Sequence, residues 1–521
     1  MATIAPQQAN TFFENSYKDY KNYPTNLVYR ASYRKVLQSY QKRLEKASAK
    51  LFNNEGTKGD QIDVRFRDYN VAQGKFDEVQ KDEIDNLTSM RVYLGDVSTA
   101  TSWKFNKRDP KCRYVLIASE MNRMQLHISR VMTNLLLSFH QVMPSYLDFM
   151  SVFGLQLDQR DLRFSGFHEQ TTLGVPQSKR PAVPQLGRSG HGYQLCYNLK
   201  AVVDKGGEGK RKEWSKRHAA IHHQFDVDNG TALWICTEGR KKDGLFDRIR
   251  DLTSDDKRKE DWSYGSKEES FISSLATHLT CCHWSIEEWR MYMGWLEETV
   301  EKETLAAISG SRNPIEGVDR KNYTSDDLQL VQGYEDQVNE VIMILEANND
   351  IMKSLSDFYD SLLKNDAFDA GLKDQCKENI REFVEQIGDM IYDANMQIRR
   401  AKLLVKITAD RKALVLQHLQ GQATEATLNL TYMSYKETII MRIITIVTLI
   451  YLPATFVSTF FSTDVVKYQG QDASGSFSST AMFRWLQVTL PLSAITLGVG
   501  YAWYRYQTKK SKKRGMYVLP Y

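Results

Sequence analysis

The sequence has little cysteine and no cysteine motif. Its 521 residues include six cysteines, and no two of them stand in C-x-x-C spacing. The adjacent pair Cys281-Cys282 is too tight for a zinc knuckle. These absences argue against a disulfide framework and a cysteine-based zinc site. They indicate reduced and mostly buried thiols in a cytosolic domain.

Signals for secretion, for enzyme chemistry and for nucleic acid are also missing. Charged residues interrupt the first 24 residues, so there is no apolar core of signal-peptide length and the N-terminal part should stay in the cytosol. The motifs G-x-x-x-x-G-K-[ST], H-E-x-x-H and G-x-S-x-G are absent, and Gly206–Gly209 is typical of a polar loop. A net charge of only +5 does not indicate a nucleic-acid partner. We therefore expect no enzyme, no cofactor and no nucleic-acid binding.

Residues 1–305 have the mixed texture of one cytosolic α/β domain with loop insertions. Partial alternation predicts strands in YQLCYNLKAVV (193–203), HAAIHHQFDV (218–227) and TALWICTE (231–238). Asp228-Asn229-Gly230 is a hairpin signal between the last two. Helical periodicity predicts helices over VLIASEMNRMQLHISRVMTNLLLSFHQVM (115–143) and over residues 271–303.

A histidine-rich segment of this domain could be imagined as a metal site. His222-His223 lie near His218, Asp226 and Asp228. Neighbouring residues of a strand point to opposite faces of the sheet, so His222 and His223 cannot share a ligand set. The pattern favours structural histidines.

Residues 306–442 are predicted to form a helical stalk. No proline occurs between Pro314 and Pro453, and Ser325 is a plausible N-cap for the first stalk helix. Helices of this length fold only if an apolar stripe packs on a partner, within the chain or between subunits. The second helix has such a stripe at Ile380, Phe383, Ile387, Met390, Ala394, Ile398, Ala401 and Leu404/Val405.

The first stalk helix is rich in acids. Such residues are typical of a solvated face, and a regulatory cation site between subunits is the alternative. They are Asp326, Asp327, Glu335, Asp336, Glu346 and Asp350.

Two uncharged runs, residues 443–463 and 485–504, each match the roughly 20 residues that cross a bilayer. An external loop over 464–484 separates them, and a basic tail over 505–521 follows. Because that tail holds five Lys or Arg within ten residues, the positive-inside rule places the C-terminus in the cytosol, and two spans place the N-terminus there too. The alternative is a pair of buried core helices.

The basic tail is also expected to contact anionic membrane lipid. Tyrosines and acids near the N-terminus argue against a mitochondrial transit peptide, so the plasma membrane is favoured.

The first span carries a hydroxyl-rich stripe. A stripe of this kind indicates water or other helices, and one helix cannot make a pore, so an aqueous path would need several copies around an axis. The alternative is that the threonines bond to their own helix and help to pack two helices. The stripe consists of Thr438, Met441, Thr445, Thr448, Leu452, Thr455 and Thr459.

Leu452 and Pro453 stand together near the middle of this span. A ring of leucines from several subunits would make a hydrophobic constriction that gates by dewetting. Pro453 removes one intrahelical hydrogen bond and kinks the helix, and the freed carbonyl can be met by a neighbour, a hydroxyl or water.

The helix that runs into MRIITIVTLIYLPATFVSTFF, the short loop, the second span and the Lys/Arg tail resemble the CorA-type magnesium transporters. They resemble most the divergent CorA-like domain proteins of filamentous fungi. The resemblance is strongest over 370–510 and weaker around YQLCYNL, HHQFDVDNGTALWI and HWSIEEWRMYMGWLEE. It implies a homopentameric funnel in which an α/β domain, a helical stalk and a two-helix transmembrane hairpin are joined. It also implies that the Thr438–Thr459 stripe faces a pore with Leu452 at a gate-like ring.

One departure from the family pattern concerns the selectivity loop. The family signature after the first span is Gly-Met-Asn, and this chain has Ser462-Thr463-Asp464 there. Five Asp464 carboxylates would attract cations strongly and repel one another, and a charged ring of this kind could hold Mg²⁺ too tightly or select poorly among divalent ions.

We therefore expect a channel or transporter for Mg²⁺ or another divalent cation, with Asp464 as the candidate metal-binding residue. A non-transporting membrane-anchored scaffold or sensor is the alternative.

Overall fold

A computed structural model of the chain describes residues 6–29, 32–53, 62–79, 83–98, 105–121, 123–155, 163–204, 213–239, 244–254, 262–308, 322–462 and 479–513. The chain divides into two compact units, Met1–Val415 and Leu416–Tyr521, called here the globular unit and the C-terminal unit.

The globular unit is built on a seven-stranded sheet with the order β2-β1-β3-β7-β6-β5-β4. β3 and β7 pair in parallel, and the other neighbouring pairs are antiparallel. The strands are β1 (Val64–Asn70), β2 (Lys75–Glu78), β3 (Cys112–Ser119), β4 (Phe167–Thr171), β5 (Gly192–Asp204), β6 (Trp214–Asp226) and β7 (Thr231–Gly239).

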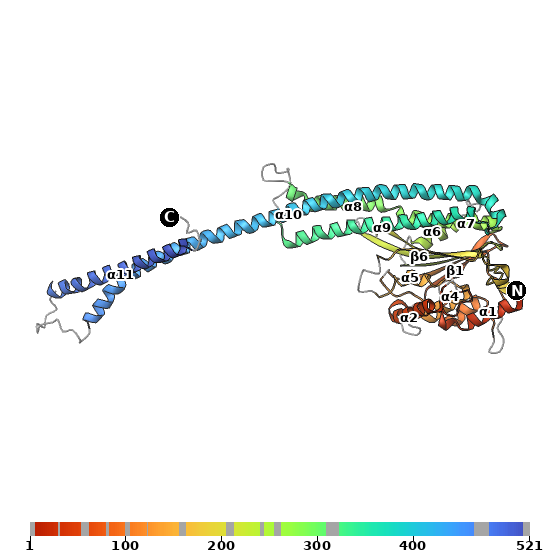
Figure 1. Cartoon of the computed structure of the whole chain (residues 1–521), viewed down its shortest axis with the longest axis horizontal. Helices are drawn as coiled ribbons and strands as arrows, with labels where there is room; N and C mark the ends of the chain where they lie inside the picture. Colours follow the sequence, from red (N-terminus) through yellow and green to blue (C-terminus); the bar gives the residue numbers. More distant parts are fainter. Residues whose placement is uncertain are drawn as a thin grey trace. The chain divides into compact units, whose positions relative to one another are not determined.

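The sheet lies between two layers of helices, which Figure 1 shows on its opposite faces. One layer holds α1 (Pro6–Lys18), α2 (Arg34–Leu51), α3 (Leu87–Tyr93), α4 (Arg130–His140) and α5 (Tyr146–Met150). The other holds α6 (Leu245–Ser254), α7 (Lys267–Ile286), α9 (Ser325–Lys364) and the first part of α10 (Ala370–Phe461). Each layer closes a separate hydrophobic core, so the central strands β3 and β7 are buried on both faces along almost their whole length.

Three of the predicted strands are confirmed, and one predicted helix is wrong in its first part. β5, β6 and β7 cover the three alternating segments, and Gly230, with a φ of 62°, ends the turn between β6 and β7. Residues 115–143 are not one helix, because Cys112–Ser119 is β3 and the helix begins at Arg130. All eight residues of β3 are buried, and a short apolar run buried on two faces cannot be told from a helix by periodicity.

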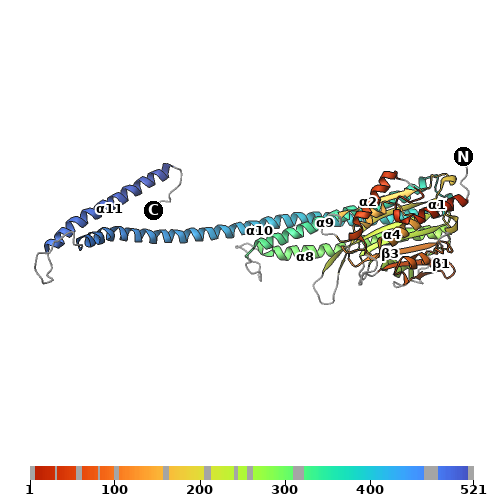
Figure 2. The same cartoon turned by 90° about the horizontal axis from the view of Figure 1, so that it is seen from below.

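The helices α8 (Trp289–Ile308), α9 and α10 run side by side within the globular unit (Figures 1 and 2). The predicted apolar stripe of α10 is confirmed, because its residues from Ile380 to Leu404 are buried in two clusters with α7, α8 and α9. Burial of the stripe within the chain supplies the partner that a long helix needs.

The first turn of α9 is capped one residue earlier than the sequence predicts. Thr324, not Ser325, is the N-cap: its hydroxyl accepts from Asp327 N, and its own backbone N–H donates to Asp327 Oδ2 at 2.8 Å. Sequence pattern allows either hydroxyl, and only the backbone dihedrals decide between them.

We expect Thr324→Ala to lower the free energy of unfolding by about 1 kcal/mol, because it removes the capping hydroxyl. Chemical denaturation of the detergent-solubilised chain measures this loss. Ser325→Ala is the matched control and should leave stability within a few tenths of a kcal/mol. Equal losses in the two variants would contradict the assignment of the cap.

The C-terminal unit consists of the last part of α10 and of α11 (Ser479–Lys513). The two segments run antiparallel, because Trp485 Nε1 donates to Ser458 Oγ at 3.0 Å while Gly500 faces Leu449. A Cβ at Gly500 would lie 3.8 Å from Leu449 Cδ2, which is an ordinary van der Waals distance, so the two helices are in contact there.

Candidate functional site

The predicted stripe forms one continuous exposed face of α10. All seven residues from Thr438 to Thr459 are exposed, and Leu452 and Met441 each keep 69% of their surface accessible. The steps of three and four residues between them keep the set in phase because an α-helix has 3.6 residues per turn. No charged residue occurs from Ile443 to Ser462.

The threonine hydroxyls of this stripe bond to their own helix. Thr438, Thr445 and Thr455 donate to the carbonyls of Ser434, Met441 and Tyr451 at 2.8, 2.7 and 3.1 Å. Thr448 and Thr459 bond back in the same way. A hydroxyl that donates its proton to the backbone keeps its lone pairs for an outside donor. The stripe therefore presents a row of hydrogen-bond acceptors.

A different face of α10 packs on α11. Pro453 and Val457 are buried and Leu449 is half-buried, whereas the threonines are exposed. At about 100° per residue, this face is centred roughly 110° around the helix from the stripe. The alternative for the stripe was that its threonines bond to their own helix and help to pack two helices. The first part is observed, but the stripe does not pack α10 against α11.

Leu452 and its neighbour Pro453 point in different directions. Leu452 is exposed on the stripe, and Pro453 is buried on the side that meets α11. Pro453 lies inside α10, so the chain remains helical through it to Phe461. A proline removes the hydrogen bond to the carbonyl four residues earlier, which is that of Leu449 on the same packed face.

The candidate selectivity tripeptide is only partly described. Ser462 follows the last helical residue, and its hydroxyl donates to Thr459 O at 2.8 Å. Thr463 and Asp464 lie outside the described residues.

The histidines of β6 do not form a metal site. His223 stacks on Trp234 with ring centroids 4.0 Å apart, on one face of the sheet, and His222 faces Tyr146 on the other. No group of three or more His, Cys, Asp or Glu in the described ranges is placed to hold a metal ion. The opposite orientation predicted for these histidines is confirmed.

Several acids of α9 already have partners within the chain. Glu335 pairs with Lys412, and Glu346 pairs with Lys402 at 2.8 Å. Asp336 accepts from Gln332 at 3.0 Å. These contacts account for three of the six acids as parts of the helix packing and the solvated face.

The contact between α10 and α11 was not predicted from the sequence. It rests on Trp485 and Gly500, and the sequence marks Trp485 only as an aromatic residue at a span end. A hydrogen bond between Ser458 and a residue 27 positions away has no signal in local periodicity.

Among the described helices, α10 is the one that is long and apolar enough to cross a membrane, with a mean hydropathy of 2.0 over its most apolar window. Only 6% of that window is buried, unlike the core helix of a globular protein. α11 contains the second uncharged run, but Gln487, Thr489 and other polar residues lower its hydropathy.

The comparisons with known proteins point to one family. The model of the CorA-like transporters matches residues 15–308, which is more than half of the chain. The full-length CmaX protein has a similar structure, with 12% identity over 86% of this chain and 99% of that one and a TM-score of 0.35. The cytoplasmic domain of ZntB from Vibrio parahaemolyticus RIMD 2210633 has 9% identity over 70% of this chain and 99% of that one, with a TM-score of 0.33.

The curated proteins include no match. The family model nevertheless covers the end of α1, the helices α2 to α8 and the whole sheet, and it describes transporters rather than enzymes. By this match, the chain is a member of the CorA-like transporter family.

Proposed function

We propose that the chain is a divalent-cation channel or transporter that works as a homopentamer. The observation that carries the proposal is the exposed stripe from Thr438 to Thr459, which is uncharged, rich in acceptor oxygens and separate from the face that packs on α11. Five such stripes around an axis would line a narrow aqueous path. Leu452 would form its hydrophobic constriction.

The acceptor oxygens suit a hydrated cation. Mg²⁺ gives up its waters reluctantly, and the waters that it holds direct their protons outward. Threonine oxygens whose own protons are held by the helix can accept those hydrogen bonds. The stripe would therefore bind the hydrated ion through its waters without removing them.

We further propose two spans with both termini in the cytosol. The uncharged run of α10 is the first span, and residues 485–504 of α11 are the second. The antiparallel contact between Ser458 and Trp485 supports a hairpin, and the basic tail supports its orientation. This topology places the family's matched domain in the cytosol, with the plasma membrane as the favoured host.

The proposed selectivity rests on sequence chemistry. Where the family has Gly-Met-Asn, the Asp464 carboxylate would draw cations to the pore mouth, and it would discriminate less among divalent ions than an amide does. Comparing Mg²⁺ with Ca²⁺, Ni²⁺ and Co²⁺ flux in the natural chain and in Asp464→Asn tests this.

Reconstitution of the pentamer into liposomes loaded with a magnesium-sensitive dye tests the function. We expect Mg²⁺ entry down its gradient, and several-fold faster entry with Leu452→Ser, because a polar ring wets the constriction. Ile450→Ser is the matched control: Ile450 is on nearly the opposite side of α10, so the rate should stay at that of the natural chain.

The alternative is a non-transporting scaffold or sensor, which the loss of Gly-Met-Asn favours. Light scattering of the detergent-solubilised chain measures its oligomeric state. A monomer or dimer could not enclose a pore, so that result would contradict transport. A well-folded pentamer that passes no divalent cation, with or without Leu452→Ser, would contradict transport and favour the scaffold.

A further inference from the structure

A buried carboxyl group, that of Glu238, holds the start of α6 against the sheet. Glu238 lies near the end of β7 and is only 4% exposed. Its two carboxyl oxygens accept from Leu245 N at 2.9 Å and from Phe246 N at 3.2 Å, and these are the first two residues of α6. The carboxyl group therefore satisfies two N–H groups that have no partner within the helix.

The other contacts that dock α6 lie along its length. At the far end of the helix, Arg67 of β1 donates to Ser254 Oγ at 2.9 Å. The side chains that α6 buries in the core are those of Leu245, Phe246 and Ile249. The polar contacts that tie α6 to the sheet are thus Glu238 at its start and Arg67 at its end.

Among the contacts of the described residues, no cation is paired with the Glu238 carboxyl group. The charged and titratable groups that face it are Arg217 on β6, Asp247 on α6, Cys236 on β7 and Cys281 on α7. Arg217 is two residues from Ala219, the register partner of Glu238, but it makes no ion pair with it. Burial without a paired cation favours the neutral acid. It raises the pKa of Glu238 to about 7, although the two N–H donors and Arg217 act in the opposite direction.

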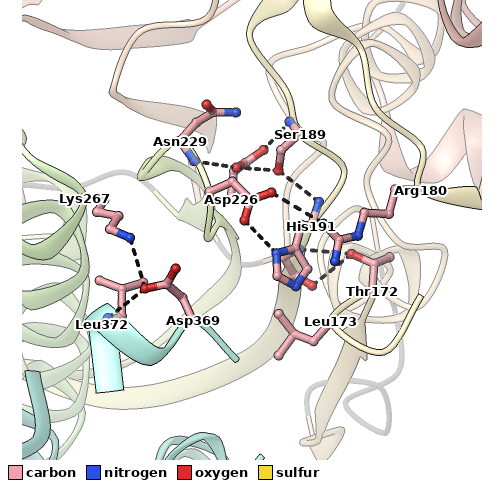
Figure 3. Close-up of polar contacts among 12 residues, drawn as sticks. Thr172, Leu173, Arg180, Ser189, His191, Asp226, Asn229, Lys267, Asp369 and Leu372 are labelled. Atoms are coloured by element: carbon pink, nitrogen blue, oxygen red, sulfur yellow. Dashed lines mark hydrogen bonds and ion pairs between the residues drawn. The ribbon is translucent and has the colours of Figure 1, made fainter. Parts of the chain in front are cut away.

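The carboxyl group at the start of α10 has the same role in a different charge environment. Asp369 accepts from Leu372 N at 2.8 Å and also pairs with Lys267 at 3.0 Å, as Figure 3 shows. Burial raises the pKa of Asp369, but the bond from Leu372 N and the pairing with Lys267 outweigh it, so the pKa is lowered overall. Asp369 is therefore charged throughout the range from pH 6 to 8, whereas Glu238 changes its charge there.

We infer that α6 is a pH-sensitive element of the globular unit, which stays docked while Glu238 is protonated and opens more often once Glu238 is charged. A protonated carboxyl group still accepts through its carbonyl oxygen and carries no charge, so it suits the buried position. A charged carboxylate gains hydration when the start of α6 moves away, because α6 covers both of its oxygens.

The direction of the pH dependence follows from where the proton binds more tightly. The docked state, with a pKa of about 7, holds the proton of Glu238 more tightly than the open state, with the ordinary pKa of 4.5. Docking is therefore strongest at low pH and weakens as the pH rises through 7. These two values predict that the opening equilibrium constant of α6 rises about tenfold from pH 6 to 8. His283 on α7 acts in the opposite direction, since burial and Arg248 of α6 lower its pKa in the docked state.

Opening of α6 would also change the charges beside α10. Arg248 of α6 is paired with Glu287 between α7 and α8, and both line a groove whose other wall includes Asp389 and Asp393 of α10. When α6 opens, Glu287 loses this cation and shares the groove with two aspartates, and Arg290 is the arginine that remains. α10 is the helix that continues into the C-terminal unit, so the change in pH would reach the helix that carries the stripe.

Hydrogen–deuterium exchange of the full chain in detergent at pH 6, 7 and 8 tests the inference, with labelling times scaled to the intrinsic exchange rate. From pH 6 to 8, protection of Leu245–Ser254 in the natural chain should fall about tenfold relative to Glu238→Gln. Glutamine keeps the shape of the side chain and stays neutral, and both proteins keep His283, so the ratio isolates the carboxyl group. Asp369→Asn is the matched control and should show the pH dependence of the natural chain.

Arg217→Met is a second, independent variant. It removes the cation that lowers the pKa of Glu238, so the midpoint of the pH dependence of α6 should move to higher pH. The same pH dependence of α6 in the natural chain, Glu238→Gln and Arg217→Met would overturn the inference. A loss of protection that is equal in α6 and α7 would overturn it as well, because that result reports unfolding of the whole unit.

Discussion

Lowering the pH from 7 to 5 should remove several kcal/mol of the free energy of unfolding of the globular unit. Burial lowers the pKa of each of His218, His222 and His278 to about 3, from the 6.5 of an unburied imidazole. For His218, nearby Lys200 and Lys216 add to the effect. As the pH falls through 6.5, the unfolded chain takes up protons that the folded chain cannot. The stability present above pH 6.5 is therefore lost progressively towards pH 3.

The expected loss is large for a domain of ordinary stability. Three such histidines together cost about 6 kcal/mol between pH 7 and 5, since each pH unit is worth about 1.4 kcal/mol per group. Burial raises the pKa of Glu238 to about 7, so this carboxyl takes up a proton in the folded state as the pH falls from 7 to 5. That uptake raises the free energy of unfolding by about 2 kcal/mol. The loss from these four groups, about 4 kcal/mol, compares with a typical total of about 5–15 kcal/mol. Burial also holds the pKa values of His140 and His223 well below 6.5, which adds to the loss.

Guanidinium unfolding followed by tryptophan fluorescence at pH 7, 6 and 5 measures this loss. His222→Leu should reduce the pH slope by about 1.4 kcal/mol per unit, because both ring nitrogens of His222 are buried without partners. His168→Gln, at an exposed position of β4, should leave the slope as it is. A midpoint that stays constant from pH 7 to 5 would show that these histidines are not buried in solution.

The strands of the sheet were predictable where polar residues or turn signals mark them, and β3, which is buried throughout, was not predicted. β5 and β6 carry polar residues at intervals, and the turn before Thr231 has strong signals. β3 is continuously buried and is followed by α4 after ten residues, so its apolar residues merge with those of the helix into one pattern. Its pairing with β1 and β7 identifies it as a strand.

The stripe was predictable because the phase of residues on a helix follows from spacing alone. Which face of α10 meets α11 was not, since Ser458 and Trp485 are joined only in three dimensions. Domain boundaries within the chain and the selectivity assigned to Asp464 stay predictions.

The family match falls where the sequence resemblance was weaker. The resemblance rests mainly on residues 370–510, whereas the family model matches 15–308. The sequence pattern of long apolar helices is simple and is shared by many unrelated helices. A seven-stranded sheet with one parallel pair restricts the residue type at many positions at once. The domain therefore identifies the family, and the spans suggest the mechanism.

Replacing the stripe threonines by valine should reduce divalent-cation flux by at least about a hundredfold. The combined variant Thr445→Val, Thr448→Val and Thr455→Val keeps the side-chain shape and removes three acceptor oxygens in each subunit. In a pentamer, each position loses five acceptors that a hydrated ion would meet. A neutral hydrogen bond is worth about 1 kcal/mol, so a loss of two or three at the narrowest point raises the barrier by about 3 kcal/mol.

The matched control is Thr489→Val with Thr496→Val on α11, where the hydroxyls do not belong to the stripe. Both proteins should remain pentameric, because threonine-to-valine changes favour burial in a bilayer. Liposome flux of Mg²⁺ then separates two physical roles of the hydroxyls. If they only bond to the backbone of α10, as Thr445 does to Met441, the stripe variant will conduct like the control. If their free lone pairs carry the hydrated ion, only the stripe variant will lose flux.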